Sequence, residues 1–504
     1  MSKQASWNLG GCGARGMACT GALLALTLAA AGVAQAQTTT PAPATATPAP
    51  AKAEDTSLTW HGITLYGIVD IGVQYNTHSA PYSDYFPATT GALLQKNAYD
   101  SPVGLSSNNL SQSRIGLSGN EPLWGDWAAV FRLETFFNPH SGDISDALKS
   151  VALNNGKAVN QQQVGVDSSV AGQLFGGAAY LGLASPTIGS FTFGRNVTIV
   201  ADGIAKYDPM GAAQAFSVIG YSGTAAGGGD TEDRRLDQSI KYVAKYGPIH
   251  LGGLYQFGSY SGSQDTAYQV QLGLEVAGLS ADAYYFKKYN AISVSALSAA
   301  QLAEVTKNCQ ADSTATPTPT PVRCYSTNTA LSGTNSDNET YAIMALYNFG
   351  AVVPLKLYAG YEHIAFNNPT NELPVGTTII GGYQLAVVNN NAYVNQKTLE
   401  VYWGGLKWNF SPDFELTLAG YGYKQNNYAF TPAAIADCQK SKILSGTCDG
   451  TLYAVSGVLD YKLTKRFDIY GGAFYNGVRD GLANGYLPSA KNNLATTLGA
   501  RFKF

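Results

Sequence analysis

The chain has 504 residues, of which 13% are charged and 11% are aromatic, with 56 glycines and 32 tyrosines. Its formal net charge is -3 and its mean hydropathy is -0.07, which excludes a helical membrane protein and leaves no basic surface for nucleic acid. A weakly charged chain rich in Gly and Tyr is typical of a β-barrel with one lipid-facing and one wet face. Composition leaves a secreted all-β sandwich or propeller open as the alternative.

The N-terminus has the features of a secretory signal peptide, predicted over residues 1–36. Lys3 and Arg15 are basic, residues 17–33 form an apolar stretch, and Ala34-Gln35-Ala36 matches a cleavage site. Residues 37–57 are rich in Pro, Ala and Thr, which predicts an extended linker. Residues 58–504 then form the folded domain, and no later run is long and apolar enough for a transmembrane helix.

Four cysteines remain after the predicted cleavage, as two close pairs in polar, loop-like stretches. An even number in an exported chain predicts disulfides, and sequence neighbours close the shortest loops. We therefore expect Cys309–Cys324 and Cys438–Cys448. A zinc site is the weaker interpretation because there is no C-x-x-C and no histidine near either pair. No cofactor or metal is expected.

Apolar and polar residues alternate with period two from the start of the domain. The first run, ITLYGIVDIGVQY, extends over more than a dozen residues, which is longer than an ordinary globular strand. We count about sixteen such runs. They start near Trp60, Gln112, Trp127, Gly176, Ser190, Arg235, Ile249, Thr266, Leu279, Glu339, Val353, Gln396, Phe414, Thr451, Arg466 and Asn492.

The connections between these runs alternate between short turns, such as PLWGD and NFSPD, and long loops. That alternation, with an even strand count that closes the sheet, predicts an outer-membrane barrel. Short helices are expected inside two loops, at 295–305 and 432–444. The run YAIMALYNF has two apolar faces, so its parity is ambiguous and it could lie at a subunit contact.

Five features of the sequence point to one family: LTWHGITLYGIVDIGVQYN, SRIGLSGNEPLWGDWAAVFRLETFF, TFGRN, RRLDQSIKYVAKYG and the terminal Phe504. They resemble the Gram-negative general diffusion porins, closest to the betaproteobacterial type. The resemblance implies an all-β fold: a sixteen-stranded antiparallel transmembrane β-barrel, usually a homotrimer in outer-membrane lipid, with an inward-folded third loop. It implies a water-filled channel for passive diffusion of small hydrophilic solutes and ions.

In this family the pore has a constriction, or eyelet, in which basic residues of the barrel wall lie opposite acidic residues of the third loop. The resemblance assigns Arg114, Arg195 and Arg235 to the wall. Ile68 occupies one of the family's basic wall positions, and the loop lacks the usual Pro-Glu-Phe-Gly-like segment. YDPMG is the nearest equivalent, which makes Asp208 the preferred loop acid. Asp202 lies in the same loop.

Alternation independently predicts which basic side chains face the lumen. The polar positions of their strands hold Arg114, Arg132, Arg235 and Lys241; Arg132 and Lys241 could also lie away from the narrowing. Arg195 shares the parity of apolar neighbours, so it needs a bulge or strand end to turn inward. Asp70 and Glu134 either balance the charge of these basic residues or simply face water in the lumen. Opposite charges across a narrow wet passage would orient and select solutes without covalent chemistry.

Three other functions remain open at this point. An enzymatic barrel would need a serine activated by histidine, and none of the five histidines adjoins a motif such as G-x-S-x-G. A substrate-specific channel for sugars or small organic acids would share the same fold. A barrel acting mainly as an adhesin would use its large loops.

Overall fold

The computed structural model describes residues 58–79, 101–144, 174–219, 234–258, 266–294, 333–350, 352–370, 379–380, 383–384, 396–428, 449–480 and 492–504. Several expectations lie outside these ranges. They are the signal peptide, the linker, all four mature cysteines and the two loop helices.

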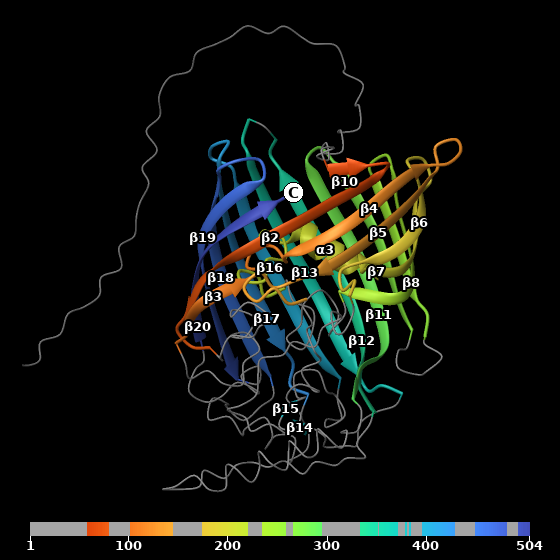
Figure 1. Cartoon of the computed structure of the whole chain (residues 1–504). Coiled ribbons are helices and arrows are strands. Elements are labelled where there is room, and N and C mark those ends of the chain that lie inside the picture. Colours follow the sequence, from red (N-terminus) through yellow and green to blue (C-terminus); the bar gives the residue numbers. More distant parts are fainter. Residues whose placement is uncertain are drawn as a thin grey trace, which may run out of the picture. The chain divides into compact units, whose positions relative to one another are not determined.

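The long strands form one antiparallel sheet that closes on itself (Figure 1). The last strand pairs with the first from Ile68↔Lys503 to Asn76↔Ala495, so the wall has no free edge. The sixteen barrel strands are β2 (Ile63–Asn76), β4 (Arg114–Pro122), β5 (Ala128–Phe136), β6 (Ala179–Ser185), β7 (Gly189–Val197), β8 (Arg235–Tyr246), β9 (Ile249–Gln256), β10 (Ala267–Val276), β11 (Leu279–Val294), β12 (Gly333–Asn348), β13 (Leu355–Asn367), β16 (Lys397–Trp408), β17 (Phe414–Gln425), β18 (Gly450–Lys462), β19 (Phe467–Asp480) and β20 (Asn492–Lys503).

Four short strands complete the described sheets. Two of them, β1 (Thr59–Trp60) and β3 (Val103–Ser107), pair with β2. The other two, β14 (Ile379–Ile380) and β15 (Tyr383–Gln384), pair only with each other.

The expected sixteen-stranded closed barrel is confirmed, and one strand is longer than its hydrophobic pattern indicated. Strand β12 begins at Gly333 rather than near Glu339. Its polar first residues continue the ladder with the end of β11, as in the pairing Ala291↔Ser336. Backbone pairing needs no apolar side chain, so a strand can extend beyond the residues that show alternation.

The predicted alternation separates an apolar outer face from a polar inner one. In β2, Leu65 and Val73 are exposed, whereas Asp70, Gln74 and Asn76 are buried inside the barrel. The same exposure of apolar side chains recurs around the wall. An outward apolar face with an inward polar one is what a barrel in lipid requires.

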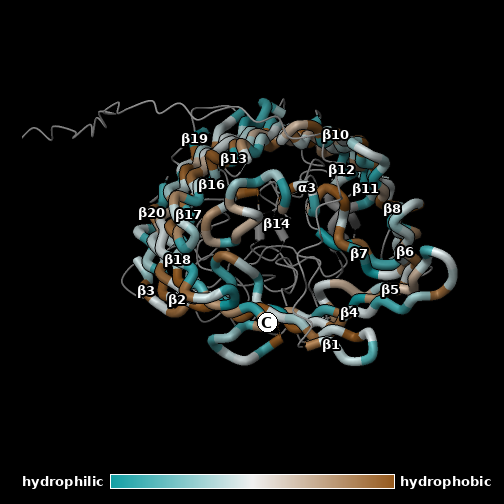
Figure 2. Tube along the Cα trace, turned by 90° about the horizontal axis from the view of Figure 1, so that it is seen from above, coloured by the Kyte–Doolittle hydropathy of each residue, from teal (hydrophilic) through white to brown (hydrophobic). Residues whose placement is uncertain are grey.

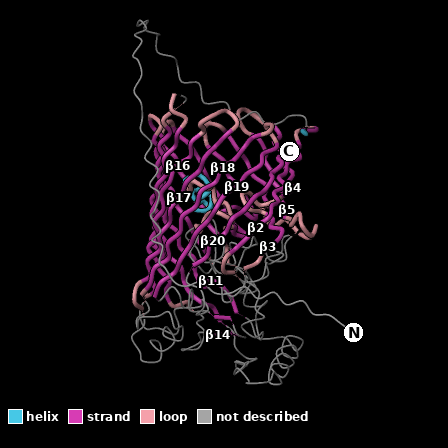
Figure 3. The backbone as a smooth tube through the Cα atoms, turned by 90° about the vertical axis from the view of Figure 1, so that its left-hand side faces the viewer, coloured by secondary structure: helices cyan, strands magenta, loops and turns pink. Residues whose placement is uncertain are grey.

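The third loop, between β7 and β8, enters the barrel and contributes its main apolar core. Its helix α3 (Ile199–Tyr207) lies inside the ring of strands when the barrel is viewed from above (Figure 2) and within the height of the wall when it is viewed from the side (Figure 3). Thr198 begins the helix by accepting a hydrogen bond from the Ala201 amide at 3.2 Å. Beyond α3, Phe216 continues the same buried cluster toward β19.

This packing explains the run with two apolar faces. In β12, Ala342 and Met344 are buried in the cluster that the third loop forms with the wall, while Tyr341 and Ile343 are exposed on the outer face. The inner apolar face of this strand is therefore covered by the protein's own loop. Among the described residues, no helix is long and apolar enough to cross a membrane.

Candidate functional site

Three barrel strands bring basic side chains around one carboxylate, Glu134 of β5. Nη2 of Arg132 lies 2.6 Å from Glu134 Oε2, and Nε of Arg114, from β4, lies 3.8 Å from the same atom. Arg235, at the start of β8, also acts electrostatically on this carboxylate. The side chains of Arg114 and Arg132 are 31% and 36% exposed, but Glu134 is only 3% exposed. The positive groups therefore meet water while the negative group lies behind them.

Tyr66 of β2 joins this cluster, although alternation alone did not single it out. Its hydroxyl donates to Glu134 Oε2 at 3.0 Å and accepts from Arg132 Nε at 2.6 Å, while the Arg132 guanidinium lies 5.0 Å from the ring centroid. These contacts fix the direction of Arg132. The inward parity of Tyr66 in its strand was the available signal, but tyrosines are also common on the outer face.

Arg195 turns away from its apolar neighbours at a β-bulge, as the sequence required. The pairing of β7 with β8 shifts register between Gly194 and Asn196, and Gly194 has a φ of +131°. The Arg195 guanidinium donates to the Gly176 carbonyl at 2.9 Å and to the Asp237 carboxylate at 2.5 Å. With 7% exposure, Arg195 is held within the wall rather than presented to the passage.

Arg235 is also largely enclosed. Its guanidinium lies 4.6 Å from the ring centroid of Phe136, and its Nε is buried with no hydrogen-bond partner among the described residues. Arg195, Arg234 and Arg114 all act electrostatically on it. The structure thus brings the predicted wall arginines into one basic region.

Lys241 of β8 meets the third loop at Asp202, in the first turn of α3. The Lys241 ammonium donates to the Val197 carbonyl at 2.9 Å and forms an ion pair with the Asp202 carboxylate. Asp202 also benefits from the positive end of the helix dipole. Its side chain is 56% exposed, so this is the predicted loop acid that reaches lumen water.

Asp208 is placed differently from the expectation that it faces the wall arginines. It follows α3, is 2% exposed, and accepts hydrogen bonds from the amides of Met210 and Ala212 and from the Tyr421 hydroxyl. Burial raises the pKa of the Asp208 carboxyl group, and the hydrogen bonds that it accepts oppose this rise. Asp208 joins the loop to β17, because its carboxylate oxygens accept hydrogen bonds from backbone amides of the loop and from the Tyr421 hydroxyl of β17. The loop's backbone turn, invisible in the sequence, decides this orientation.

Further contacts tie the same segment to the wall. Nε1 of Trp403 donates to the Tyr207 carbonyl at 3.1 Å, and the Tyr207 hydroxyl lies within hydrogen-bonding distance of Asp282. The Ala215 amide donates to the Asn109 carbonyl at 2.9 Å. The loop is therefore fixed along its described length.

Asp70 is not a counter-charge to the basic region. It is fully buried and accepts hydrogen bonds from the amides of Leu110 and Ser111 and from the Tyr470 hydroxyl. Asp70 thus holds the segment that precedes β4, whereas Glu134 fulfils the counter-charge role.

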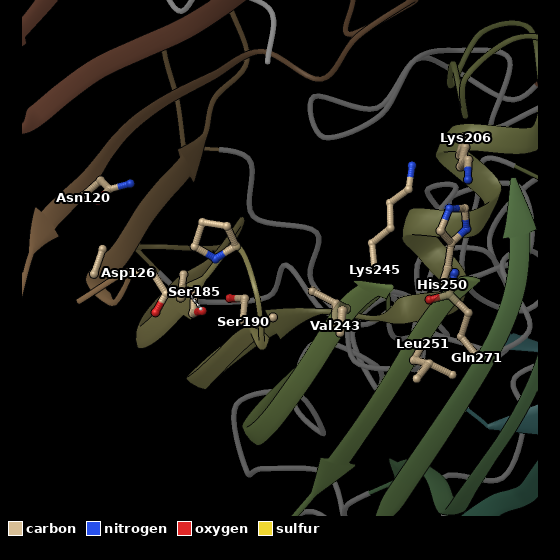
Figure 4. Close-up of a pocket in the computed structure, with 15 residues that line it drawn as sticks. Asn120, Asp126, Ser185, Ser190, Lys206, Val243, Lys245, His250, Leu251 and Gln271 are labelled. Atoms are coloured by element: carbon tan, nitrogen blue, oxygen red, sulfur yellow. Dashed lines mark hydrogen bonds between the residues drawn. The ribbon is translucent and has the colours of Figure 1, made fainter. Parts of the chain in front are cut away.

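A cavity of about 670 Å³ opens at the short-turn end of the lumen (Figure 4). Lys206, Lys245 and His250 lie on one side of it, and Asp126 lies on the other. The basic groups are paired rather than free. The Glu275 carboxylate lies 2.6 Å from the Lys245 ammonium and 3.1 Å from Nε2 of His250. The Asp282 carboxylate lies 3.2 Å from Nδ1 of His250 and 3.3 Å from the Lys206 ammonium.

A serine–histidine contact bears on the enzymatic alternative. Oγ of Ser107 lies 2.5 Å from Nδ1 of His140. Ser107 is 4% exposed, so its hydroxyl has little contact with solvent. In the part of the chain that the structure describes, no group of three or more His, Cys, Asp or Glu side chains could hold a metal ion.

Comparison with known proteins agrees with this geometry. The family model for Gram-negative porins matches residues 22–481. The chain is 28% identical over 212 residues to an outer membrane porin protein of Bordetella pertussis and 27% identical over 207 residues to outer membrane porin protein 32 of Delftia acidovorans. Each match covers 41% of this chain and 46% of the relative, so the chain spans about half the length of these relatives.

The solved anion-selective porin from Comamonas acidovorans has the same fold. It superimposes with a TM-score of 0.53 at 18% identity, covering 88% of this chain and 99% of that one. The family match extends over most of the sequence, and the solved porin shares the closed barrel. The chain therefore belongs to the Gram-negative porin family and is a protein of the outer membrane.

Proposed function

We propose that the protein forms a water-filled channel through which small hydrophilic solutes and ions diffuse passively across the outer membrane. The observation that carries this proposal is the pair Arg114 and Arg132, which reach lumen water from the wall while Glu134 lies buried behind them. Charges fixed beside a narrow aqueous passage act on solutes through a weakly screened field. They select by charge and size and form no covalent bond.

The wall beside Glu134 favours anions over cations, because Arg114 and Arg132 reach water there while the carboxylate is buried. Arg114 and Arg132 present their guanidinium groups to water, and Asp202 opposes them from the third loop with its charge already paired to Lys241. The structural relative from Comamonas acidovorans, described as anion-selective, shares the fold. We therefore expect moderate anion selectivity.

Reconstitution in planar lipid bilayers tests both statements. The purified protein should produce stepwise conductance, and a salt gradient should give a reversal potential of the sign expected for anions. Saturation of conductance by one sugar or organic acid would instead favour a substrate-specific channel. Insertion without conductance would favour an adhesin.

We further infer that the working unit is a homotrimer embedded in outer-membrane lipid. Membership of the Gram-negative porin family, whose resemblance implies a homotrimer, supports the trimer. The apolar outer face, as at Val73, Leu105 and Leu498, fits contact with lipid. Analytical ultracentrifugation in detergent tests it. A single species of protomer mass that nevertheless conducts would contradict it.

A further inference from the structure

Glu362, on the inner face of β13, is a buried carboxyl group without a hydrogen-bond donor. It is 0% exposed, and both of its carboxyl oxygens lack a partner among the described residues. Its cross-strand neighbours are Ala342 of β12 and Val401 of β16, and Ile364 follows it on the same face of β13. All three belong to the buried apolar cluster. The carboxyl group therefore lies in apolar surroundings.

Helix α3 of the third loop covers this part of the wall. It lies against β12 and β13, and its buried residues Val200 and Ile204 belong to the same apolar cluster. Glu362 is thus enclosed between the strands and the loop. Motion of α3 away from β12 and β13 would open this apolar layer to lumen water.

Arg234, which lies just before β8, acts electrostatically on Glu362. Its Nη2 donates to the Ala201 carbonyl of α3 at 3.4 Å, and it makes further contacts. The ionisable groups of α3 itself are directed elsewhere. Asp202 pairs with Lys241, and both Lys206 and the Tyr207 hydroxyl contact Asp282. Farther along the wall, the ammonium of Lys397 in β16 lies over the Phe366 and Tyr428 rings.

We propose that protonation of Glu362 keeps the third loop docked against the barrel wall, so that Glu362 acts as a proton-operated pin. A carboxylate without donors in an apolar layer is far more costly than the neutral acid, so the packed loop accommodates Glu362 in its protonated form. Ionisation requires water or a cation, and either is reached only if α3 leaves the wall. Rising pH therefore shifts the equilibrium toward an undocked loop in which the carboxylate is hydrated or pairs with Arg234.

Asp208 does not provide the same response. It is equally buried, but two backbone amides and the Tyr421 hydroxyl donate to it. An ionised Asp208 therefore keeps its donors while the loop stays docked. Replacing Glu362 alone is expected to remove the part of the pH dependence of docking that is linked to its proton.

Hydrogen–deuterium exchange of the intact protein in detergent tests the proposal. Amide exchange of peptides from residues 199–216 would be measured between pH 5 and pH 9 in the unmodified protein and in Glu362→Gln, which is neutral at every pH. The ratio of the two rates removes the intrinsic pH dependence of exchange. We expect this ratio to rise by up to about tenfold per pH unit, because undocking is linked to loss of one proton. Peptides from β18 serve as the internal reference.

A ratio that stays constant over this range would overturn the proposal. If Glu362→Gln does not assemble into a heat-resistant barrel, Glu362→Met supplies a neutral side chain of similar length for the same measurement. The effect of undocking on ion flow rests on the proposed channel function. A rising ratio in a protein that does not conduct would leave the pin intact and refute the channel, whereas a conducting protein with a flat ratio would refute only the pin.

Discussion

The Tyr421 hydroxyl donates a 2.7 Å hydrogen bond to Oδ1 of Asp208 and thereby joins the barrel wall to the third loop. Asp208 Oδ2 accepts from the Ala212 amide at 2.9 Å, so the carboxylate also closes the turn that follows α3. Both residues are buried. The contact therefore holds the loop in place, and it does not belong to the exposed charges that solutes meet.

Replacing Asp208 by Asn should loosen the third loop with little change in ion selectivity. The new amide would place a donor against the Ala212 amide, and each buried donor left without an acceptor costs about 1–3 kcal/mol. We expect larger open-channel current noise and faster amide exchange at residues 209–216. Tyr421→Phe should have the same effect to a smaller degree, because it removes one hydrogen bond.

Tyr402→Phe is a matched control for that experiment. Tyr402 lies on the outer face of β16 and is exposed, so its hydroxyl has no role in holding the loop. An Asp208→Asn channel with unchanged noise but a large shift in reversal potential would mean that Asp208 faces the passage after all.

The third loop also marks the limit of what the sequence predicts. Period-two alternation predicted the sixteen strands because lipid outside and water inside impose opposite chemistries on alternate residues. It could not predict that Met344 on the inner face is covered by the chain's own loop, since an apolar inward residue looks the same whatever covers it. The direction of Asp208 likewise depends on a turn with no periodic signal.

Arg195 illustrates the intermediate case. Its parity conflicts with its polarity, which by itself predicts a bulge, and the register shift between Gly194 and Asn196 confirms the bulge. The pattern could not say whether the guanidinium would face water or be enclosed by Asp237 and Gly176. That outcome depends on residues far apart in the sequence.

Removing the exposed positive charge of Arg132 should shift selectivity toward cations. In Arg132→Gln the passage loses a charge whose side chain is 36% exposed, while Glu134 loses its nearest partner. Reversal potentials in a potassium chloride gradient should move toward the cation limit, more at 0.1 M than at 1 M salt. The Debye length falls from about 10 Å to about 3 Å between these concentrations.

Lys465→Gln controls for the change in net charge, because Lys465 lies exposed in the turn between β18 and β19. It should leave the reversal potential unchanged. Equal shifts in the two variants, or none in either, would show that Arg132 does not line the passage that limits ion flow.

The bulge at Gly194 should be sensitive to a methyl group. Gly194 has a φ of +131°, and a Cβ added there would overlap the Ala179 carbonyl oxygen. Gly194→Ala should lower the free energy of unfolding by about 1–3 kcal/mol through the disallowed backbone conformation alone. In gel-shift assays the folded barrel of this variant should therefore unfold at a lower temperature. Gly420→Ala, where a Cβ would meet nothing within 4 Å, should be neutral. Equal midpoints for both variants would contradict the strained geometry.

The ion pair between Lys241 and Asp202 should affect ion flow more than stability. Asp202 is 56% exposed, and an exposed pair contributes at most about 1 kcal/mol. Lys241→Gln frees the Asp202 carboxylate in lumen water, and we expect the reversal potential to move toward cations while the unfolding midpoint changes little. Asp202→Asn should move it toward anions, and the double variant should return close to the original value. A double variant whose reversal potential stays close to that of either single variant would contradict this, because neutralising both charges leaves the net charge of the passage unchanged.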